Sequence, residues 1–85
     1  MAYTISIDPA ALREMKKLPA KVRQEVANAI DSLATDPRPS GSRKLSTSKN
    51  SYRIRVGDYR ILYRIADREL SIIVVKVGDR KDVYR

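Results

Sequence analysis

Arginines in two neighbouring segments, 52–56 and 59–65, are the residues whose type and spacing most directly suggest chemistry. Tyrosines and aliphatic residues hold every second position of both segments, as in strands with one buried face. A guanidinium carries its donors in a fixed fork that binds two phosphate oxygens at once. We therefore predict a phosphate-binding site, whereas the alternative is a set of solvated side chains on an exposed sheet face. The set is Arg53, Arg55, Arg60 and Arg64.

The net charge of +8 is concentrated around these arginines. Residues 38–64 contain eight arginines and lysines and a single acid, Asp58, whereas residues 1–37 contain five basic and five acidic side chains. A face of one charge repels itself and lowers stability, so a polyanionic partner explains it better than the needs of folding. Nucleic acid is the first candidate.

The composition excludes several kinds of site. The 85 residues include no cysteine and no histidine, which removes thiolate chemistry, the usual proton shuttle at neutral pH and the commonest metal ligand. The acids are not paired near the basic half, so no carboxylate cage for Mg²⁺ is indicated. We expect no metal, no cofactor and no small-molecule substrate. With no signal-peptide pattern and no long apolar stretch, we expect a cytoplasmic protein without a membrane segment.

The first half predicts one strand and two helices. Residues 3–8 alternate between apolar and polar, and Asp8 followed by Pro9 gives an N-cap and a first helical residue. This helix ends before Pro19, which can open a second helix. The second helix has one apolar stripe, made of Val22, Val26, Ile30 and Leu33.

The segment between the helical half and the arginines predicts a loop. Two prolines and a glycine follow Asp36 within five residues, so the chain must leave the helix there. We expect a basic, mobile loop to about Ser51. Its lysines, Lys44 and Lys49, are either peripheral phosphate contacts or only solubilising side chains.

The two arginine segments predict a β-hairpin around Gly57-Asp58. A two-residue loop that starts with glycine suits a type II′ turn. This turn sets Arg55 directly opposite Arg60, and two like charges in such a cross-strand pair lower the stability of a sheet by about 0.2 to 1 kcal/mol. No acidic residue is placed to offset the repulsion of the two arginines. A local conflict of this kind, which folding alone would avoid, is expected at a functional site. The predicted pairs are Val56 with Tyr59, Arg55 with Arg60, and Arg53 with Leu62.

The last predicted strand runs from Leu70 to Val77 and is apolar except at Ser71 and Lys76, which is typical of a central strand covered on both faces. The expected fold is α+β, a single domain over residues 1–85. An N-terminal strand, a two-helix hairpin and a three-stranded antiparallel meander form a four-stranded sheet with the helices packed on it. The tyrosines on the apolar parity, Tyr52, Tyr59 and Tyr63, are expected in the core.

The C-terminal residues add a possible nucleotide contact. Tyr84 stands close to Arg80, Lys81 and Arg85. Its ring either stacks on a base, as aromatic side chains do in proteins that bind single strands, or fastens the chain end onto the sheet.

This order of elements, together with YRIRVGDYRILYRI and VVKVGDRKDVYR, resembles the RelE/ParE toxin superfamily over essentially the whole chain. The resemblance implies a toxin of a toxin-antitoxin pair, with a RelB-like antitoxin as partner. In the RelE branch it implies an endoribonuclease that cuts mRNA in the ribosomal A site without a metal. The ribose 2′-hydroxyl would attack its own 3′ phosphate, and the ribosome would position the mRNA.

The resemblance also implies roles for individual residues. Arg60 would hold the scissile phosphate, Arg80 would stabilise the transition state or protonate the leaving oxygen, and Tyr84 would orient the nucleotide. Arg53 and Arg55 stand where well-studied RelE proteins carry lysines. Weaker RNA contacts are expected from Lys44, Lys49, Arg64 and Lys81.

The general base and the function class have alternatives. Arginine is not deprotonated at ordinary pH, so neither Arg53 nor Arg55 is a conventional base. The candidates are a Tyr84 phenolate, Asp82, or no base, with the hydroxyl activated electrostatically. The alternatives to a nuclease are a ParE-like inhibitor of DNA gyrase, which the basic cluster disfavours, and a non-catalytic nucleic-acid-binding module.

Overall fold

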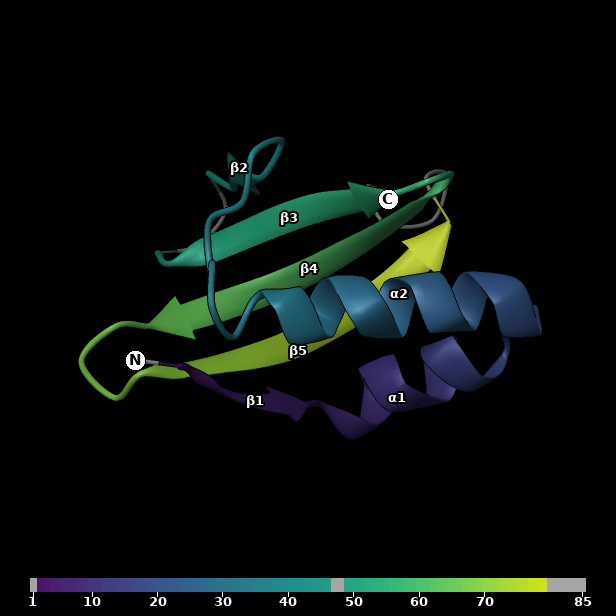
Figure 1. Cartoon of the computed structure of the whole chain (residues 1–85), viewed down its shortest axis with the longest axis horizontal. Helices are drawn as coiled ribbons and strands as arrows, with labels where there is room; N and C mark the ends of the chain where they lie inside the picture. Colours follow the sequence, from purple (N-terminus) through teal and green to yellow (C-terminus); the bar gives the residue numbers. More distant parts are fainter. Residues whose placement is uncertain (1, 47–48, 80–85) are drawn as a thin grey trace.

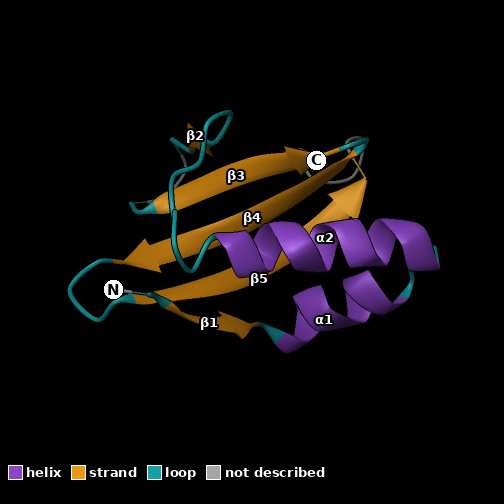
Figure 2. Ribbon diagram, in the orientation of Figure 1, coloured by secondary structure: helices purple, strands orange, loops and turns teal. Residues whose placement is uncertain are grey.

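The computed structural model describes residues 2–46 and 49–79 and contains two helices and one five-stranded sheet within them (Figure 1). Both helices lie over the same face of the sheet (Figure 2). The spatial order of the strands is β1-β5-β4-β3-β2. The elements are β1 (Thr4–Ile7), α1 (Pro9–Lys16), α2 (Ala20–Ser32), β2 (Arg43–Lys44), β3 (Ser51–Val56), β4 (Tyr59–Ala66) and β5 (Ser71–Asp79).

The α+β class, the helical hairpin and the antiparallel meander β3-β4-β5 are confirmed, with β1 added parallel to β5. The prediction of four strands is wrong, because Arg43–Lys44 pairs with β3 as a fifth strand inside the segment expected to be a loop. Two residues are too few to show a period-two pattern, so this strand has no signature of its own in the sequence.

The start of each helix follows from its local sequence. The Asp8 carboxylate accepts a hydrogen bond from the Ala10 amide at 3.0 Å, and Pro9 occupies the first turn, where a missing N–H costs nothing. Pro19 precedes α2 in the same way but offers no side-chain cap. Neither α1 nor α2 is long and apolar enough to cross a membrane.

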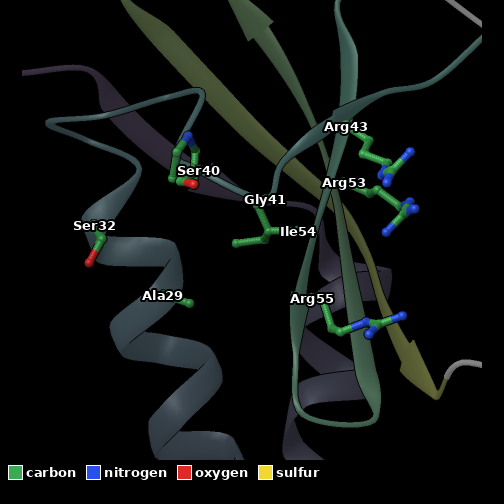
Figure 3. Close-up of a pocket in the computed structure, with 9 residues that line it drawn as sticks. Ala29, Ser32, Ser40, Gly41, Arg43, Arg53, Ile54 and Arg55 are labelled. Carbon is green, nitrogen blue, oxygen red and sulfur yellow. The ribbon is translucent and has the colours of Figure 1, made fainter.

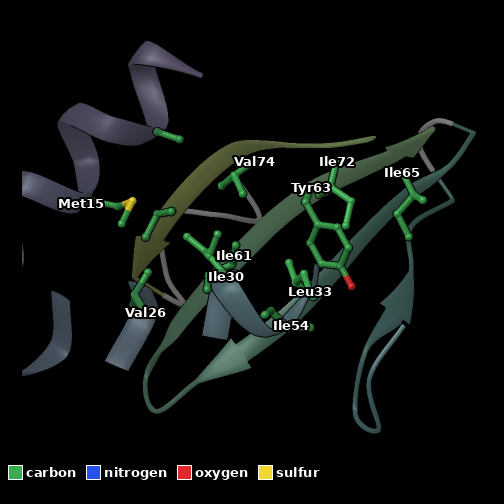
Figure 4. Packing of buried hydrophobic residues seen from close by; sticks show 12 residues of the cluster. Met15, Val26, Ile30, Leu33, Ile54, Ile61, Tyr63, Ile65, Ile72 and Val74 are labelled. Atoms are coloured by element: carbon green, nitrogen blue, oxygen red, sulfur yellow. The ribbon is translucent and has the colours of Figure 1, made fainter. Parts of the chain in front are cut away.

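The core lies between the two helices and the sheet (Figure 4). Tyr63 is fully buried at its centre, as predicted, and its hydroxyl donates to the Pro37 carbonyl at 2.8 Å. Burial raises the pKa of Tyr63 to about 12. Tyr52 stacks on Tyr63, with ring centroids 6.1 Å apart, and is half-buried. The fully or nearly buried set is Ala11, Met15, Val26, Ile30, Leu33, Ile54, Ile61, Tyr63, Ile65, Ile72, Val74 and Val77.

Strand β5 is central but is not covered on both faces as predicted. Ile72, Val74 and Val77 face the core, whereas Ile73 on the other face is 37% exposed. The reason is that α1 and α2 both pack on the same side of the sheet, so the described residues provide no layer over the second face (Figure 2). The register shifts between Leu62 and Tyr63, where β5 contributes an extra residue.

Past the end of β1, the side chain of Glu14 in α1 contacts β5. The last register partners of β1 are Ile7 and Val74, so among the described residues no strand lies beside the outer edge of β5 past Val74. The Glu14 carboxylate accepts from the Val77 amide at 3.1 Å and pairs with the Lys76 ammonium at 3.0 Å. This contact fixes the second half of β5 against α1.

A clasp formed by Arg38, Asp67, Tyr3 and Tyr52 ties the segment after α2 to the sheet. The Arg38 guanidinium binds both Asp67 oxygens, at 2.8 and 3.3 Å, and its Nε donates to the Tyr52 hydroxyl at 3.0 Å. Tyr3 donates to Asp67 at 2.7 Å. The Arg38 bond lowers the pKa of Asp67, whereas the Asp67 bond raises the pKa of Tyr3.

Candidate nucleic-acid interface

The hairpin predicted from the sequence is present with the predicted register. Val56 pairs with Tyr59 and Arg55 with Arg60, across a turn in which Gly57 has φ 58°. Asp58 is not among the residues with positive φ, so the turn has the pattern of type II′. Glycine adopts a positive φ without steric cost, whereas residues with a side chain rarely do, which explains why this residue opens the turn.

The register places the arginines on the sheet face away from the helices. Side chains alternate along a strand, and the partners Ile54 and Ile61 are buried in the core. Arg55 and Arg60 therefore lie on the opposite face. We call this surface the arginine face, and the described residues that form it are Arg43, Arg53, Arg55, Arg60 and Arg64.

Arg60 is the most buried member of the arginine face, with only 4% of its surface exposed, whereas Arg55 is exposed. On its other side Arg60 pairs with Gly78 of β5, which has no side chain to fill the adjacent space. Desolvating a cation next to another cation costs stability. The fold therefore holds the positive charge of Arg60 in a fixed place next to Arg55.

Arg43 belongs to the same surface and was not predicted. It is the register partner of Arg53 across β2 and β3, so their side chains share a face. The only signal in the sequence was its place in the basic segment 38–64. The side of the sheet on which the Arg43 side chain lies cannot be predicted from the sequence, because the alternation of side chains has no reference until the strand pairing is known.

Lys49 lies beside both of the other weaker candidates, because it lines one hollow with Arg64 and another with Lys44. Lys49 and Arg64 line a cavity of about 440 Å³ together with Asn50, at the end of β4 away from the turn. Lys44 pairs with Tyr52, whose ring packs against the core, so Lys44 lies on the side of the sheet opposite the arginines. The structure brings Arg64 and Lys49 together but does not bring Lys44 to the arginine face.

A second hollow of about 520 Å³ lies between α2 and the outer edge of β3 (Figure 3). Ile54 points into it and Ala29 forms its helical wall, whereas Arg43, Arg53 and Arg55 point away from α2 to the far side of the strand. We call this hollow the edge groove. Its remaining lining residues are Ser32, Pro39, Ser40 and Gly41.

The chemistry available on the arginine face is electrostatic. Among residues 2–46 and 49–79, no three acidic side chains gather in a way that could hold a metal ion. Guanidinium groups on a rigid hairpin can orient a phosphate and stabilise charge that develops on its oxygens. This arrangement suits binding of a nucleic-acid backbone.

Comparison with known proteins identifies the family. The sequence model of the family described as ParE toxin of type II toxin-antitoxin system, parDE, matches residues 5–84. The chain belongs to the RelE/ParE toxin superfamily. It is 31% identical to toxin RelG of Mycobacterium tuberculosis over 86 residues, which cover 100% of this chain and 99% of RelG. It is also 31% identical to the mRNA interferase toxin RelE of Escherichia coli over 88 residues, covering 99% and 92%.

Solved structures agree with the RelE-like branch. The toxin-antitoxin complex RelBE2 of M. tuberculosis superposes with a TM-score of 0.82 at 27% identity, covering 94% of this chain and 100% of that one. The intact RelBE complex of E. coli gives 0.81 at 29% identity, covering 92% and 96%. The chain is thus a RelE-type toxin of toxin-antitoxin systems, as the sequence resemblance indicated.

Several residues that were given roles from the sequence lie outside the described part of the chain. They are Arg80, Lys81, Asp82 and Tyr84. The described chain stops at Asp79, which pairs with Tyr59, one residue from Arg60. The roles of Arg80, Lys81 and Tyr84, and that of Asp82 as a candidate base, therefore stay predictions.

Proposed function

We propose that this RelE-like toxin is a metal-independent endoribonuclease that cuts mRNA in the ribosomal A site. The observation that carries the proposal is the opposed pair Arg55 and Arg60, with Arg60 buried, on a face that also holds Arg53 and Arg43. The E. coli relative named an mRNA interferase toxin supports the same class of reaction.

In this reaction the ribose 2′-oxygen attacks the adjacent 3′ phosphorus in line. The bond from phosphorus to the 5′-oxygen of the next nucleotide breaks, leaving a 2′,3′-cyclic phosphate and a 5′-hydroxyl. The proton of the 2′-hydroxyl is lost and the leaving oxygen gains one. A transition state of this kind is stabilised mainly by orientation and by fixed positive charge around the phosphate oxygens.

Arg60 is assigned to the scissile phosphate, because a buried guanidinium is held in one place by its surroundings. Arg53 and Arg55 supply further positive charge, Arg80 stabilises the transition state or protonates the leaving oxygen, and Tyr84 orients the nucleotide. An arginine cannot serve as the base. We therefore assign activation of the 2′-hydroxyl to the electrostatic field of the cluster.

The proposed partners are a RelB-like antitoxin, the ribosome and its mRNA, in the cytoplasm. The solved complexes of the M. tuberculosis and E. coli relatives, which are toxin-antitoxin complexes, support the antitoxin. Arg64 and Lys49 extend the positive surface toward flanking RNA, since they line one cavity at the far end of β4.

The test adds the purified toxin to a translating extract and maps cleavage by primer extension along a defined mRNA, with free RNA as control. We expect cuts only at ribosome-bound codons, with 2′,3′-cyclic phosphate ends. Arg60→Ala should abolish the cuts, whereas Arg13→Ala, an exposed arginine on α1, should leave them unchanged. Cuts with 3′-hydroxyl ends would contradict the mechanism.

The matching family is described as ParE toxins, which makes inhibition of DNA gyrase the second candidate. A gyrase supercoiling assay separates the two. Gyrase inhibition that survives Arg60→Ala, without mRNA cleavage, would replace the nuclease assignment. RNA binding without cleavage or gyrase inhibition would favour a binding module.

A further inference from the structure

The outer edge of β5 loses its strand neighbour halfway along. The register of β1 on β5 ends with Ile7 opposite Val74, and the Asp8 amide donates to the Val74 carbonyl at 2.8 Å. Strand β5 continues to Asp79, and among the described residues no strand lies beside this second half on its outer side. A backbone N–H that points to such an edge needs another acceptor where it is buried.

The carboxylate of Glu14 is the acceptor at this edge. Helix α1 begins directly after Asp8, so it follows the end of β1 (Figure 1). Glu14 Oε1 accepts from the Val77 amide at 3.1 Å, and Oε2 pairs with the Lys76 ammonium at 3.0 Å. Val77 is buried, so little water reaches its amide. A side chain of α1 thus accepts a hydrogen bond where a neighbouring strand would otherwise do so.

The direction of the Val77 amide determines how Gly78 meets β4. Backbone groups alternate in direction along a strand, so a Val77 N–H that points outward leaves Gly78 directed toward β4, where its register partner is Arg60. The Ile65 amide donates to the Asn50 carbonyl on the β3 side, so Arg60, at an odd spacing from Ile65, directs its backbone toward β5. Gly78 and Arg60 therefore form a hydrogen-bonded pair, in which each N–H donates to the other residue's C=O.

We propose that Glu14 is a positioning residue, which holds the end of β5 through the Val77 amide and thereby fixes Gly78 against Arg60. Glu14 lies on the helix side of the sheet, away from the arginine face, so it acts without contacting the RNA. The Lys76 ion pair contributes little, because the Lys76 side chain is 40% exposed. The inference rests on the proposed function, since it is the role assigned to Arg60 that makes this position matter.

Substitutions of similar length separate the acceptor oxygen from the side chain that carries it. Glu14→Gln keeps an oxygen for the Val77 amide and loses only the Lys76 ion pair, whereas Glu14→Met loses both. Lys76→Met removes the ion pair from the other side. Circular dichroism checks that the variants fold, and Glu14→Asp, with its carboxylate drawn back by a methylene, replaces Glu14→Met if that variant is unfolded.

The first measurement is hydrogen exchange of backbone amides by NMR in the purified toxin, without ribosomes or RNA. We expect the Gly78 amide to exchange at least about tenfold faster in Glu14→Met than in the parent, because the end of β5 is released from α1. The Ile73 amide is the internal control, since it also points to β4 but lies in the half of β5 that pairs with β1. Equal acceleration at both amides would overturn the proposal, because it would mean a general loss of stability.

The second measurement is single-turnover cleavage of mRNA on ribosomes over a range of toxin concentrations. The maximal rate constant of Glu14→Met should fall by about 10 to 10²-fold, because a small displacement of a group that holds the substrate is costly. The toxin concentration that gives half of this rate should change little, since no binding contact is lost. Glu14→Gln and Lys76→Met should keep most of the parental rate. Ile30→Val, which lowers stability through the core, should cut at the parental rate.

Two results on cleavage would contradict the role of Glu14. One is a folded Glu14→Met variant that cuts at the parental rate although its Gly78 amide exchanges faster. The other is an equal loss in Glu14→Gln, which would assign the effect to the charge of Glu14 instead of the hydrogen bond to Val77. If the parent itself cuts no mRNA, the proposed function fails, whereas the exchange of the Gly78 amide still decides whether Glu14 holds the end of β5.

Discussion

Arg55 and Arg60 face each other in a non-hydrogen-bonded pair, the closer of the two kinds of antiparallel pair. The assignment follows from the Leu45 to Ser51 hydrogen bond and the register of β3 with β4. In such pairs the Cα atoms are only about 4.5 Å apart, so the side chains start close together. The fold therefore holds two like charges side by side at the centre of the arginine face.

Replacing the exposed member of this pair should stabilise the toxin and destroy its activity. In Arg55→Glu the new carboxylate faces Arg60, which turns a repulsive pair into an attractive one. We expect the free energy of unfolding to rise by about 0.2 to 1 kcal/mol. Urea denaturation measures this change, and the translating extract measures the loss of cleavage.

The control for Arg55→Glu is Arg68→Glu, which makes the same change of charge in the turn between β4 and β5. It should alter neither stability nor cleavage by a comparable amount. A less stable Arg55→Glu variant would show that the opposed pair is not a source of strain.

Two substitutions of Arg60 separate charge from geometry. Arg60→Met keeps the length but removes the charge, and we expect single-turnover cleavage on ribosomes to fall by about 10² to 10³-fold. Arg60→Lys keeps the charge but loses the fork and should fall in between. Equal losses in both variants would mean that bidentate geometry, not charge, is what Arg60 supplies.

Arg43 and Lys44 give a matched test of the arginine face, because they are adjacent but lie on opposite sides of the sheet. Each phosphate contact to a single strand contributes about 0.7 to the slope of log affinity against log salt. Arg43→Met should reduce this slope by about that amount, whereas Lys44→Met should leave it unchanged. A filter-binding titration of an RNA oligonucleotide across salt concentrations measures both. Equal changes would show that Lys44 also reaches the RNA.

The sequence predicts those parts of the fold that depend on local rules. The Asp8-Pro9 start of α1 and the turn at Gly57 were predictable because their signals lie within a few residues. The hairpin register followed from the turn alone, and with it the opposed pair Arg55 and Arg60.

The features that the sequence did not predict depend on contacts between distant segments. Strand β2 exists because two residues meet β3, and Arg43 gains its place on the arginine face only through that pairing. The sequence shows Arg38 only as one of the cations of the basic segment, whereas in the structure it binds Asp67 in the turn after β4. Ile73 is exposed because both helices pack on the other side of the sheet, and a continuous apolar run does not specify on which side the helices pack.

Glu14 should contribute to stability more than an ordinary helix acid, because it accepts a hydrogen bond from the buried Val77. The Glu14 side chain itself is 30% exposed. We expect Glu14→Ala to lower the free energy of unfolding by about 1 to 3 kcal/mol, since the Val77 amide loses its acceptor. Glu14→Gln keeps an acceptor oxygen and loses only the Lys76 ion pair, so it should cost about 0 to 1 kcal/mol. In urea denaturation, Glu25→Ala on the exposed face of α2 serves as control, and a loss in that variant equal to Glu14→Ala would contradict the assignment.

Asp67 should make the stability of the toxin sensitive to acid. Its pKa in the folded protein is lowered by Arg38 and by Tyr3, so its ion pair contributes stability that is fully present above the ordinary carboxyl value of about 3.9. That contribution is lost as the pH falls through the lowered folded value. Asp67→Asn lacks it at every pH and should therefore be less stable than the parent at pH 6 and approach it in stability as the pH falls through the lowered pKa of Asp67. Thermal unfolding from pH 6 to pH 2 measures the difference, with Glu25→Gln as control. A gap between Asp67→Asn and the parent that stays constant over this range would show that the carboxylate of Asp67 is not what titrates.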